Sequence, residues 1–177
     1  VGVGLVVHIA GLLALKGTAK GTCESLGTFC VTVAVIIWVV GLGSGIALTE
    51  MGEKYVSYLA GAQAGNAAAV DAVASITVAG GFIQAASVAS GQLGTLLASL
   101  GWLLIGFAYR GVDFKGALSF IPLGWLAIVA GVIGLVSTII ISNVVSVEAS
   151  NQISGIVFLL VMIWSVLVGV KLVKDSK

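Results

Sequence analysis

The chain has 177 residues, of which 59% are hydrophobic and 8% are charged, whereas a soluble domain has about 25% charged residues. Its 8 basic and 7 acidic side chains are too few to cover a water-exposed surface. This composition excludes a soluble monomer, and the high hydrophobicity excludes intrinsic disorder. The net charge of +1 gives no basic field, which excludes a nucleic-acid-binding protein. We therefore expect an all-α integral membrane protein in which residues 1–177 form a single membrane domain, an up-down bundle of transmembrane helices.

Five apolar segments are predicted to cross the bilayer, because a helix needs about 20 apolar residues to pass through the hydrocarbon layer. Four segments are long enough on their own, namely residues 27–49, 82–109, 120–142 and 152–173. Residues 1–15 are apolar but short, and the sequence begins without Met. We interpret this first segment as the remaining part of a fifth span, preceded by either a removed leader or a missing start.

Residues 50–81 are interpreted as an Ala-rich helical cap outside the bilayer, on the basis of the basic residues. With this segment outside, the five spans alternate so that Lys54 is the single basic residue on the outer side. The other seven fall on the opposite side, an asymmetry typical of cytoplasmic loops. They are Lys16, Lys20, Arg110, Lys115, Lys171, Lys174 and Lys177. The predicted location is the cell membrane, with the N-terminus outside and the C-terminus in the cytoplasm.

Small residues recur at heptad spacing on two of the spans, and such seams let helices approach closely in lipid. The span 82–109 carries Gln84, Ser87, Gly91, Gly94, Ala98 and Gly101, and the span 120–142 carries Gly124, Ala127, Gly131, Gly134 and Thr138. We expect these two spans to form the core of the bundle, with residues 27–49 packed against them. The last span has a weaker stripe of small residues and is predicted to be peripheral.

His8 is the single histidine and lies near the middle of the first segment. An ionisable residue within a span is a functional candidate by default, and His8 could bind a heme iron or relay a proton. One histidine cannot supply both axial ligands from this chain, and a His–Met pair of His8 with Met51 or Met162 is conceivable. The alternative is a structural role, in which His8 forms a hydrogen bond to a neighbouring helix or lies near the outer surface.

Gln84 is the candidate for a buried amide, on the seam of small residues. Together with Ser87, Thr95 and Thr138, it could line a polar cavity. The alternative is a packing role, in which these side chains form hydrogen bonds between helices.

Arg110 and Lys115 lie in a short turn and are predicted to anchor helix ends at lipid headgroups, which long basic side chains can reach. Cys23 and Cys30 are predicted to be reduced thiols on the cytoplasmic side. The sequence contains no HExxH, Walker loop, GxSxG or Cys/His cluster. We therefore expect neither enzyme activity from this chain alone nor a metal site.

Residues 100–135, LGWLLIGFAYRGVDFKGALSFIPLGWLAIVAGVIGL, resemble an uncharacterised family of bacterial and archaeal multi-pass membrane proteins of unknown function. In that family a span ends in a glycine with an arginine a few residues later. A short basic turn comes next, and a Leu-Gly-Trp-Leu helix containing Ala-Gly follows. The matching positions are Gly106, Arg110, Leu123, Gly124, Trp125, Leu126, Ala130 and Gly131. The resemblance implies six or seven spans and a long external segment such as residues 50–81, and it carries no catalytic residues.

The seams of small residues and the scarcity of charge within the spans favour a non-catalytic integral membrane subunit. Such a subunit would pack against partner membrane proteins, a second copy or membrane lipids, and no cofactor is predicted for it. One alternative is a small-solute transporter or channel that uses the polar residues around Gln84. Another is a heme- or quinone-associated electron-transfer subunit that uses His8. The high content of Val, Ile, Gly and Ala with little Arg indicates a prokaryote.

Overall fold

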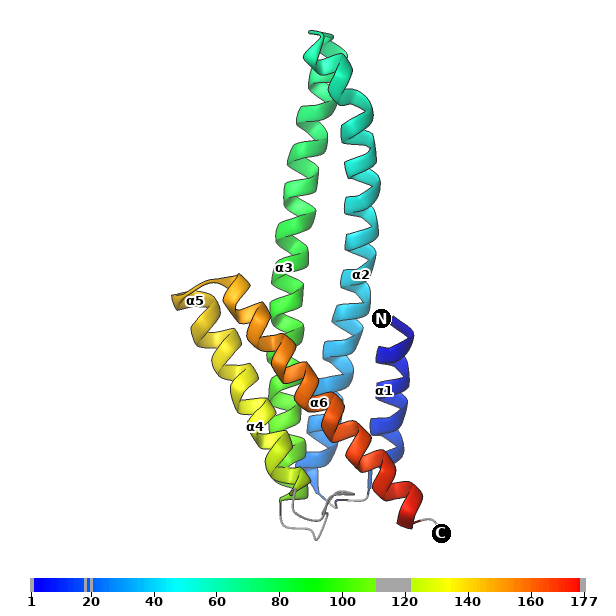
Figure 1. Cartoon of the computed structure of the whole chain (residues 1–177), viewed down its shortest axis with the longest axis vertical. Coiled ribbons are helices and arrows are strands. Elements are labelled where there is room, and N and C mark those ends of the chain that lie inside the picture. Colours follow the sequence, from blue (N-terminus) through cyan, green and yellow to red (C-terminus); the bar gives the residue numbers. More distant parts are fainter. Residues whose placement is uncertain (1, 18, 20, 111–121, 176–177) are drawn as a thin grey trace. The chain divides into compact units, whose positions relative to one another are not determined.

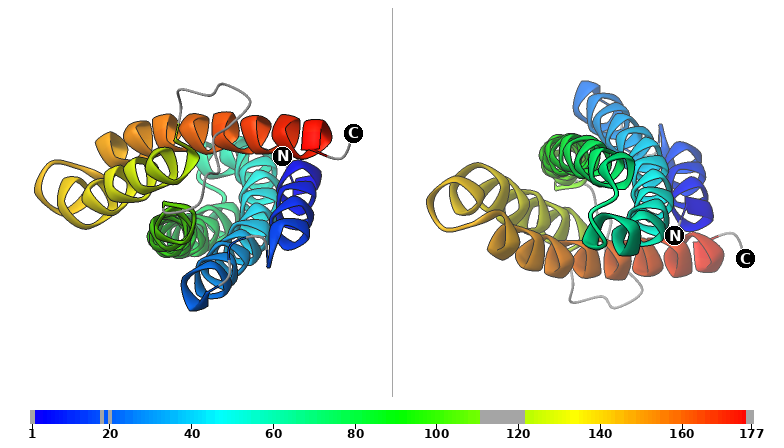
Figure 2. Two further views of the ribbon diagram at one scale, coloured as in Figure 1. Left: turned by 90° about the horizontal axis from the view of Figure 1, so that it is seen from below. Right: turned by 90° about the horizontal axis from the view of Figure 1, so that it is seen from above.

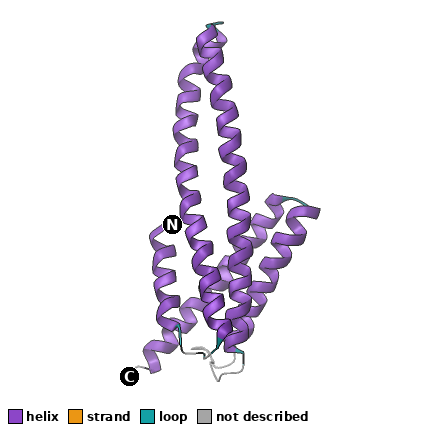
Figure 3. Cartoon of the chain, turned by 180° about the vertical axis from the view of Figure 1, so that it is seen from behind, coloured by secondary structure: helices purple, strands orange, loops and turns teal. Residues whose placement is uncertain are grey.

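The computed structural model describes residues 2–17, 19, 21–110 and 122–175, and most of these residues are helical (Figures 1 and 3). The elements are α1 (Gly2–Leu15), α2 (Thr22–Gln63), α3 (Ala67–Tyr109), α4 (Leu123–Val136), the π-helix η1 (Ser137–Ile141), α5 (Ser142–Val144) and α6 (Val147–Asp175). The prediction of an all-helical chain is thereby confirmed for the described residues, which contain no strand. Four helical stretches are long and apolar enough to cross a membrane: Thr22–Gln63, Ala67–Tyr109, Leu123–Val144 and Val147–Lys171.

Helices α2 and α3 are longer than the spans predicted within them, with 42 and 43 residues. Neither helix has an end near residue 49 or residue 82, because hydropathy marks where a bilayer would end and not where a helix ends. The one proline of the chain is Pro122, and the first glycine with positive φ after residue 49 is Gly65. Residues 50–81, predicted to be a cap, therefore continue α2 and α3 and contain the turn between them.

The turn between α2 and α3 is fixed by its own backbone. Gly65 has φ of +80°, a left-handed conformation that glycine adopts without steric cost. The amide of Asn66 donates to the carbonyl of Gly61 (3.0 Å), and the amide of Gly65 donates to the carbonyl of Ala62 (3.0 Å). This is the Schellman pattern of a helix C-terminus. Asn66 then caps α3, because its Oδ1 accepts a hydrogen bond from the amide of Ala69 (3.3 Å).

The chain divides into two compact units, which share α2 and α3. The first unit comprises Val1–Ile36 and Leu93–Lys177, and the second comprises Ile37–Gln92. In the first unit, glycines bring helix backbones into contact. A Cβ placed on Gly27 of α2 would lie 2.7 Å from the carbonyl oxygen of Gly101 on α3, and a Cβ on Gly101 would lie 2.7 Å from that of Gly27.

The contact between α3 and α4 in the first unit is equally close. A Cβ on Gly106 would lie 2.7 Å from the carbonyl oxygen of Gly124, and a Cβ on Gly131 would lie 2.6 Å from the amide nitrogen of Leu103. These glycines permit a backbone approach that larger residues would prevent. The predicted pairing of the spans 82–109 and 120–142 is confirmed for this part of the two helices.

Helix α6 belongs to the core of the first unit, so its predicted peripheral position is wrong. Trp164 is 1% exposed, and its indole Nε1 donates a 3.0 Å hydrogen bond to the carbonyl oxygen of Leu123 at the start of α4. Its ring also packs edge-on against that of Trp102 on α3, with centroids 5.0 Å apart. Figure 2 shows α4 and α6 side by side. Large side chains make this contact, which a search for small residues does not detect.

The second unit is a helical hairpin formed by the later part of α2 and the earlier part of α3. All of its residues are described, and Ala69 is the only one that is buried. Ala69 lies near the turn, where a Cβ on Gly61 would come within 3.1 Å of the Ala69 side chain. A two-helix unit of this kind has no hydrophobic core of its own.

Candidate functional site: an apolar cavity and a buried carboxyl

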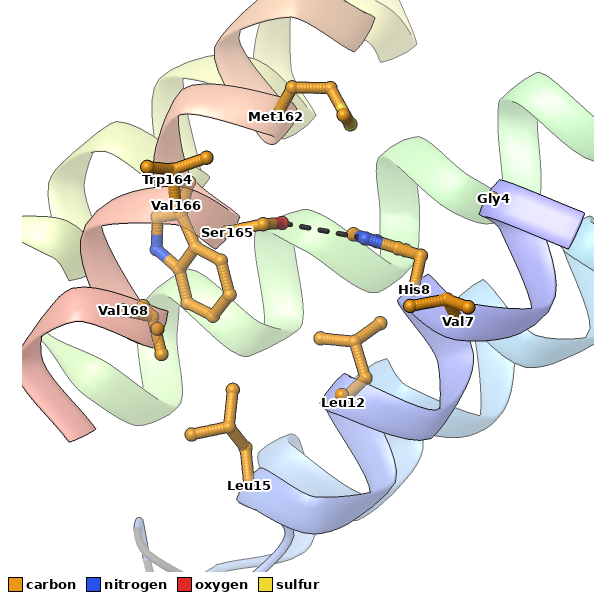
Figure 4. Close-up of a pocket in the computed structure, with 12 residues that line it drawn as sticks. Gly4, Val7, His8, Leu12, Leu15, Met162, Trp164, Ser165, Val166 and Val168 are labelled. Carbon is orange, nitrogen blue, oxygen red and sulfur yellow. Dashed lines mark hydrogen bonds between the residues drawn. The ribbon is translucent and has the colours of Figure 1, made fainter. Parts of the chain in front are cut away.

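A cavity of about 320 Å³ lies between α1 and α6 in the first unit (Figure 4). The lining residues from α1 recur at intervals of three and four positions and therefore lie on one face of that helix. The lining residues are Gly4, Val7, His8, Gly11, Leu12 and Leu15 from α1, and Met162, Trp164, Ser165, Val166, Val168 and Gly169 from α6. The volume falls at the lower end of the range for small-molecule sites, roughly 300–1,000 Å³.

The cavity wall is apolar except at one place, where His8 and Ser165 meet. Nδ1 of His8 lies 3.4 Å from Oγ of Ser165, the contact drawn in Figure 4. The Ser165 hydroxyl also donates to the carbonyl oxygen of Val161 at 2.9 Å. The imidazole ring packs against Trp102, with ring centroids 5.8 Å apart. His8 of α1 therefore contacts both α3 and α6, and it presents a polar group to an otherwise hydrophobic cavity.

The first unit also contains a buried carboxyl group that the sequence analysis missed. Glu24 lies in the first turn of α2 and is 3% exposed. Among the described residues, its oxygens accept hydrogen bonds from the amide of Gly17 (2.9 Å), the amide of Ala19 (3.3 Å) and the hydroxyl of Tyr109 (2.8 Å). Glu24 therefore ties the connection between α1 and α2 to the end of α3.

Glu24 also lines a second cavity, of about 10 Å³, whose wall includes Thr28, Tyr109 and Trp164. A volume of this size is close to the minimum for one water molecule. The rings of Tyr109 and Trp164 pack edge-on, 6.2 Å between centroids. The Glu24 carboxyl therefore lies in the core beside Tyr109 and Trp164, and Trp164 also lines the cavity that contains His8.

The structure brings together some of the predicted site residues and not others. His8 and Met162 line the same cavity, whereas Met51 belongs to the second unit. Gln84, predicted to be a buried amide, is exposed, and Ser87 is half-buried. These two belong to the second unit, while Thr95 and Thr138 belong to the first. None of the four polar residues lines the cavity between α1 and α6.

Thr138 is buried within the π-helix η1, and its hydroxyl has no hydrogen-bond partner among the described residues. The neighbouring Ser137 is satisfied, because its hydroxyl donates to the carbonyl oxygen of Ser150 (3.0 Å) and lies 3.1 Å from the Ser150 hydroxyl. Thr95 is half-buried, and its carbonyl oxygen accepts a hydrogen bond from the Ser99 hydroxyl at 2.7 Å. The Ser137 hydroxyl therefore joins η1 to the first turn of α6.

The two basic residues predicted to contact headgroups lie at the end of α3 and beyond it. Arg110 is exposed, with its guanidinium carbon 5.6 Å from the ring centroid of Phe107. Lys115 lies outside the described residues. Cys23 and Cys30 are both free thiols. Within the described ranges, no three His, Cys, Asp or Glu side chains are grouped so that they could hold a metal ion.

No protein-family model, curated protein or solved structure matches the chain. The resemblance of residues 100–135 to a multi-pass family therefore stays a prediction. The fold itself defines the class: an all-helical chain with four helices that could span a membrane.

Proposed function

We propose that the chain is a non-catalytic integral membrane subunit whose second unit packs against a partner membrane protein or a second copy. One observation carries the proposal: the hairpin Ile37–Gln92 buries Ala69 alone. Large apolar side chains are left exposed along it, among them Ile46, Val56, Val78 and Phe82, with Val78 74% exposed. An exposed apolar surface of this extent is typical of an interaction surface or a membrane-facing one.

The position of these side chains favours a protein partner over lipid for part of the hairpin. Under the proposed topology, residues 50–81 lie outside the bilayer, so lipid tails cannot cover Val56 and Val78. Each buried Å² of apolar surface contributes about 25 cal/mol, which gives a protein partner a reason to bind there. Between the large side chains lie Ala, Gly and Ser, which let another helix approach closely.

The proposed topology keeps five spans, with the N-terminus outside and the C-terminus in the cytoplasm. In the first unit, one end carries the C-terminal ends of α1, α3 and α6 together with the N-terminal ends of α2 and α4 (Figure 1). Lys16, Arg110, Lys171 and Lys174 belong to this end, and Glu148 belongs to the opposite end, where α6 begins. Clustering of basic residues at one end supports its assignment to the cytoplasm.

The test of the subunit proposal is photo-crosslinking in native membranes. A photoreactive amino acid replaces Val56 or Val78 in the full chain, and the matched control carries it at Val129, an exposed position on α4. We expect covalent adducts larger than the monomer from positions 56 and 78. Mass spectrometry then distinguishes a second copy from another protein, and either supports the proposal. Monomer alone at both positions would overturn it.

The orientation has its own test, which uses a membrane-impermeant maleimide on intact cells. In a background with Cys23→Ser and Cys30→Ser, Glu53→Cys should be labelled before permeabilisation and Lys174→Cys only afterwards. Both native side chains are exposed, so access is not limited by packing. Labelling of both variants from the same face would contradict the proposed topology.

A further inference from the structure

Beyond the proposed subunit role, we propose that the cavity between α1 and α6 binds an apolar molecule that carries a hydroxyl group, whose O–H donates to Nε2 of His8. The cavity, of about 320 Å³, has walls that are apolar apart from the meeting point of His8 and Ser165. Trp164 adds no free polar group to the wall, because its indole N–H is bonded to Leu123. The ligand must therefore be largely hydrophobic, with one polar group to pair with the imidazole.

The type of polar group follows from the proton positions around Ser165. A serine hydroxyl has one proton, and at 2.9 Å the carbonyl oxygen of Val161 is the better acceptor for it than Nδ1 of His8 at 3.4 Å. With that proton engaged, a hydrogen bond between the two side chains has the Ser165 oxygen as the acceptor, and we assign the imidazole proton to Nδ1 on this ground. In neutral imidazole, the other nitrogen is an acceptor. Nε2 has no hydrogen bond with any residue that the structure describes.

An unprotonated Nε2 selects between ligand chemistries. A ketone or an ester offers only acceptors and leaves Nε2 unpaired, and an unpaired buried polar group costs about 1–3 kcal/mol. A hydroxyl group supplies the missing donor. Two sources share this chemistry in a membrane: an aromatic hydroxyl, as in a hydroquinone, and the alcohol of a lipid such as a diacylglycerol.

The walls have room for such a ligand because three of the lining residues are glycines. A Cβ on Gly4, Gly11 or Gly169 would meet no atom within 4 Å, so these positions border open space. Gly11→Leu would consequently project a large side chain into the cavity from α1, since its Cβ meets no neighbouring atom. This variant blocks the site while leaving the His8 imidazole intact.

The experiment uses two photoreactive probes that differ in one group, 4-hydroxybenzophenone and 4-methoxybenzophenone, with the purified full chain in lipid nanodiscs. We expect the hydroxy probe to label residues of the α1 and α6 walls about tenfold more than the methoxy probe, the factor that corresponds to one hydrogen bond. His8→Leu should remove this preference, and His8→Gln, which restores an acceptor oxygen, should recover part of it. Gly11→Leu should abolish wall labelling by both probes.

Durohydroquinone and dioleoylglycerol are then tested as competitors of labelling by the hydroxy probe. Competition by one of them identifies the source of the hydroxyl group and supports the proposal. If neither competes, the proposal is overturned. Equal labelling by the two probes would mean that the cavity holds any apolar molecule, which also overturns it. Hemin is added to the wild type and to His8→Leu in a separate experiment. A Soret band that is present with the wild type and lost with His8→Leu would show that Nε2 binds iron, which also overturns the proposal. His8→Leu is used only if it elutes as the wild type does in size-exclusion chromatography. If it does not, the labelling of the wild type and of Gly11→Leu by the two probes decides the outcome.

Discussion

Tyr109 and Glu24 are 85 residues apart in the sequence, yet the Tyr109 hydroxyl donates a 2.8 Å hydrogen bond to Oε1 of the Glu24 carboxyl. Both side chains are buried. The bond connects the beginning of α2 to the end of α3, within the first unit. A buried carboxyl is costly unless it is hydrogen-bonded, so the stability of this end of the unit depends on the donors to Glu24, of which Tyr109 is one.

Tyr109→Phe is predicted to lower the free energy of unfolding by about 1–3 kcal/mol, because it removes one donor and leaves a buried carboxyl oxygen with fewer partners. The measurement is denaturant-induced unfolding in detergent, followed by circular dichroism. Tyr58→Phe is the matched control, since Tyr58 is 45% exposed and its hydroxyl can bond to water. It should change the free energy by less than about 0.5 kcal/mol. Equal stabilities of the two variants would show that the bond to Glu24 contributes nothing.

A second prediction concerns the glycine contact between α2 and α3. Gly27→Ala would place a Cβ 2.7 Å from the carbonyl oxygen of Gly101 and 2.9 Å from the amide nitrogen of Ile105. Because these are backbone atoms, the helices must move apart, and we expect a loss of about 1–3 kcal/mol.

Gly43→Ala on the same helix is the control for this prediction, since a Cβ there meets nothing within 4 Å. Alanine favours a helix over glycine by about 1 kcal/mol, so this variant should be as stable as the wild type or more stable. The two variants are compared by thermal unfolding in the same detergent. A Gly27→Ala variant that matches Gly43→Ala would contradict the close contact.

The sequence predicts the close pairing of α3 and α4 because its signal is local: small residues at regular spacing on each helix. Gly124 and Gly131 were found in this way, and both are buried against α3. Glu24 has no such signal. It stands at the start of a helix, where an acidic residue is ordinarily explained by the helix dipole, and its partner Tyr109 is distant in the sequence.

The same limit explains the errors at Gln84 and α6. Gln84 continues the small-residue seam of α3, but it belongs to the hairpin unit, where it is exposed. A heptad pattern does not tell where along a long helix the partner helix is present. Trp164 is buried in the core, where its large ring packs and its indole N–H donates to Leu123. A search for regularly spaced small residues detects neither property.

A third prediction tests that role of Trp164. Trp164→Phe removes the donor to the Leu123 carbonyl and leaves a small void beside Trp102 and Tyr109. The loss of the hydrogen bond and of packing should together cost about 2–3 kcal/mol. Trp125→Phe is the control, because Trp125 is 52% exposed. Circular dichroism is the suitable measurement, since both variants change the fluorescence. A cost for Trp125→Phe as large as that for Trp164→Phe would argue against a core position of α6.

The last prediction has the opposite sign and concerns the π-helix. Thr138→Val replaces a buried hydroxyl that has no partner among the described residues with a methyl group of the same shape. Removing an unsatisfied polar group from an apolar site should stabilise the protein by about 1 kcal/mol. Ser137→Ala, one residue away, removes a hydroxyl that is bonded to Ser150 and should destabilise it by about 1 kcal/mol. The two unfolding midpoints are measured side by side in detergent. If both variants are destabilised, the Thr138 hydroxyl has a partner of its own in the folded protein, and η1 is a polar site and not only a packing element.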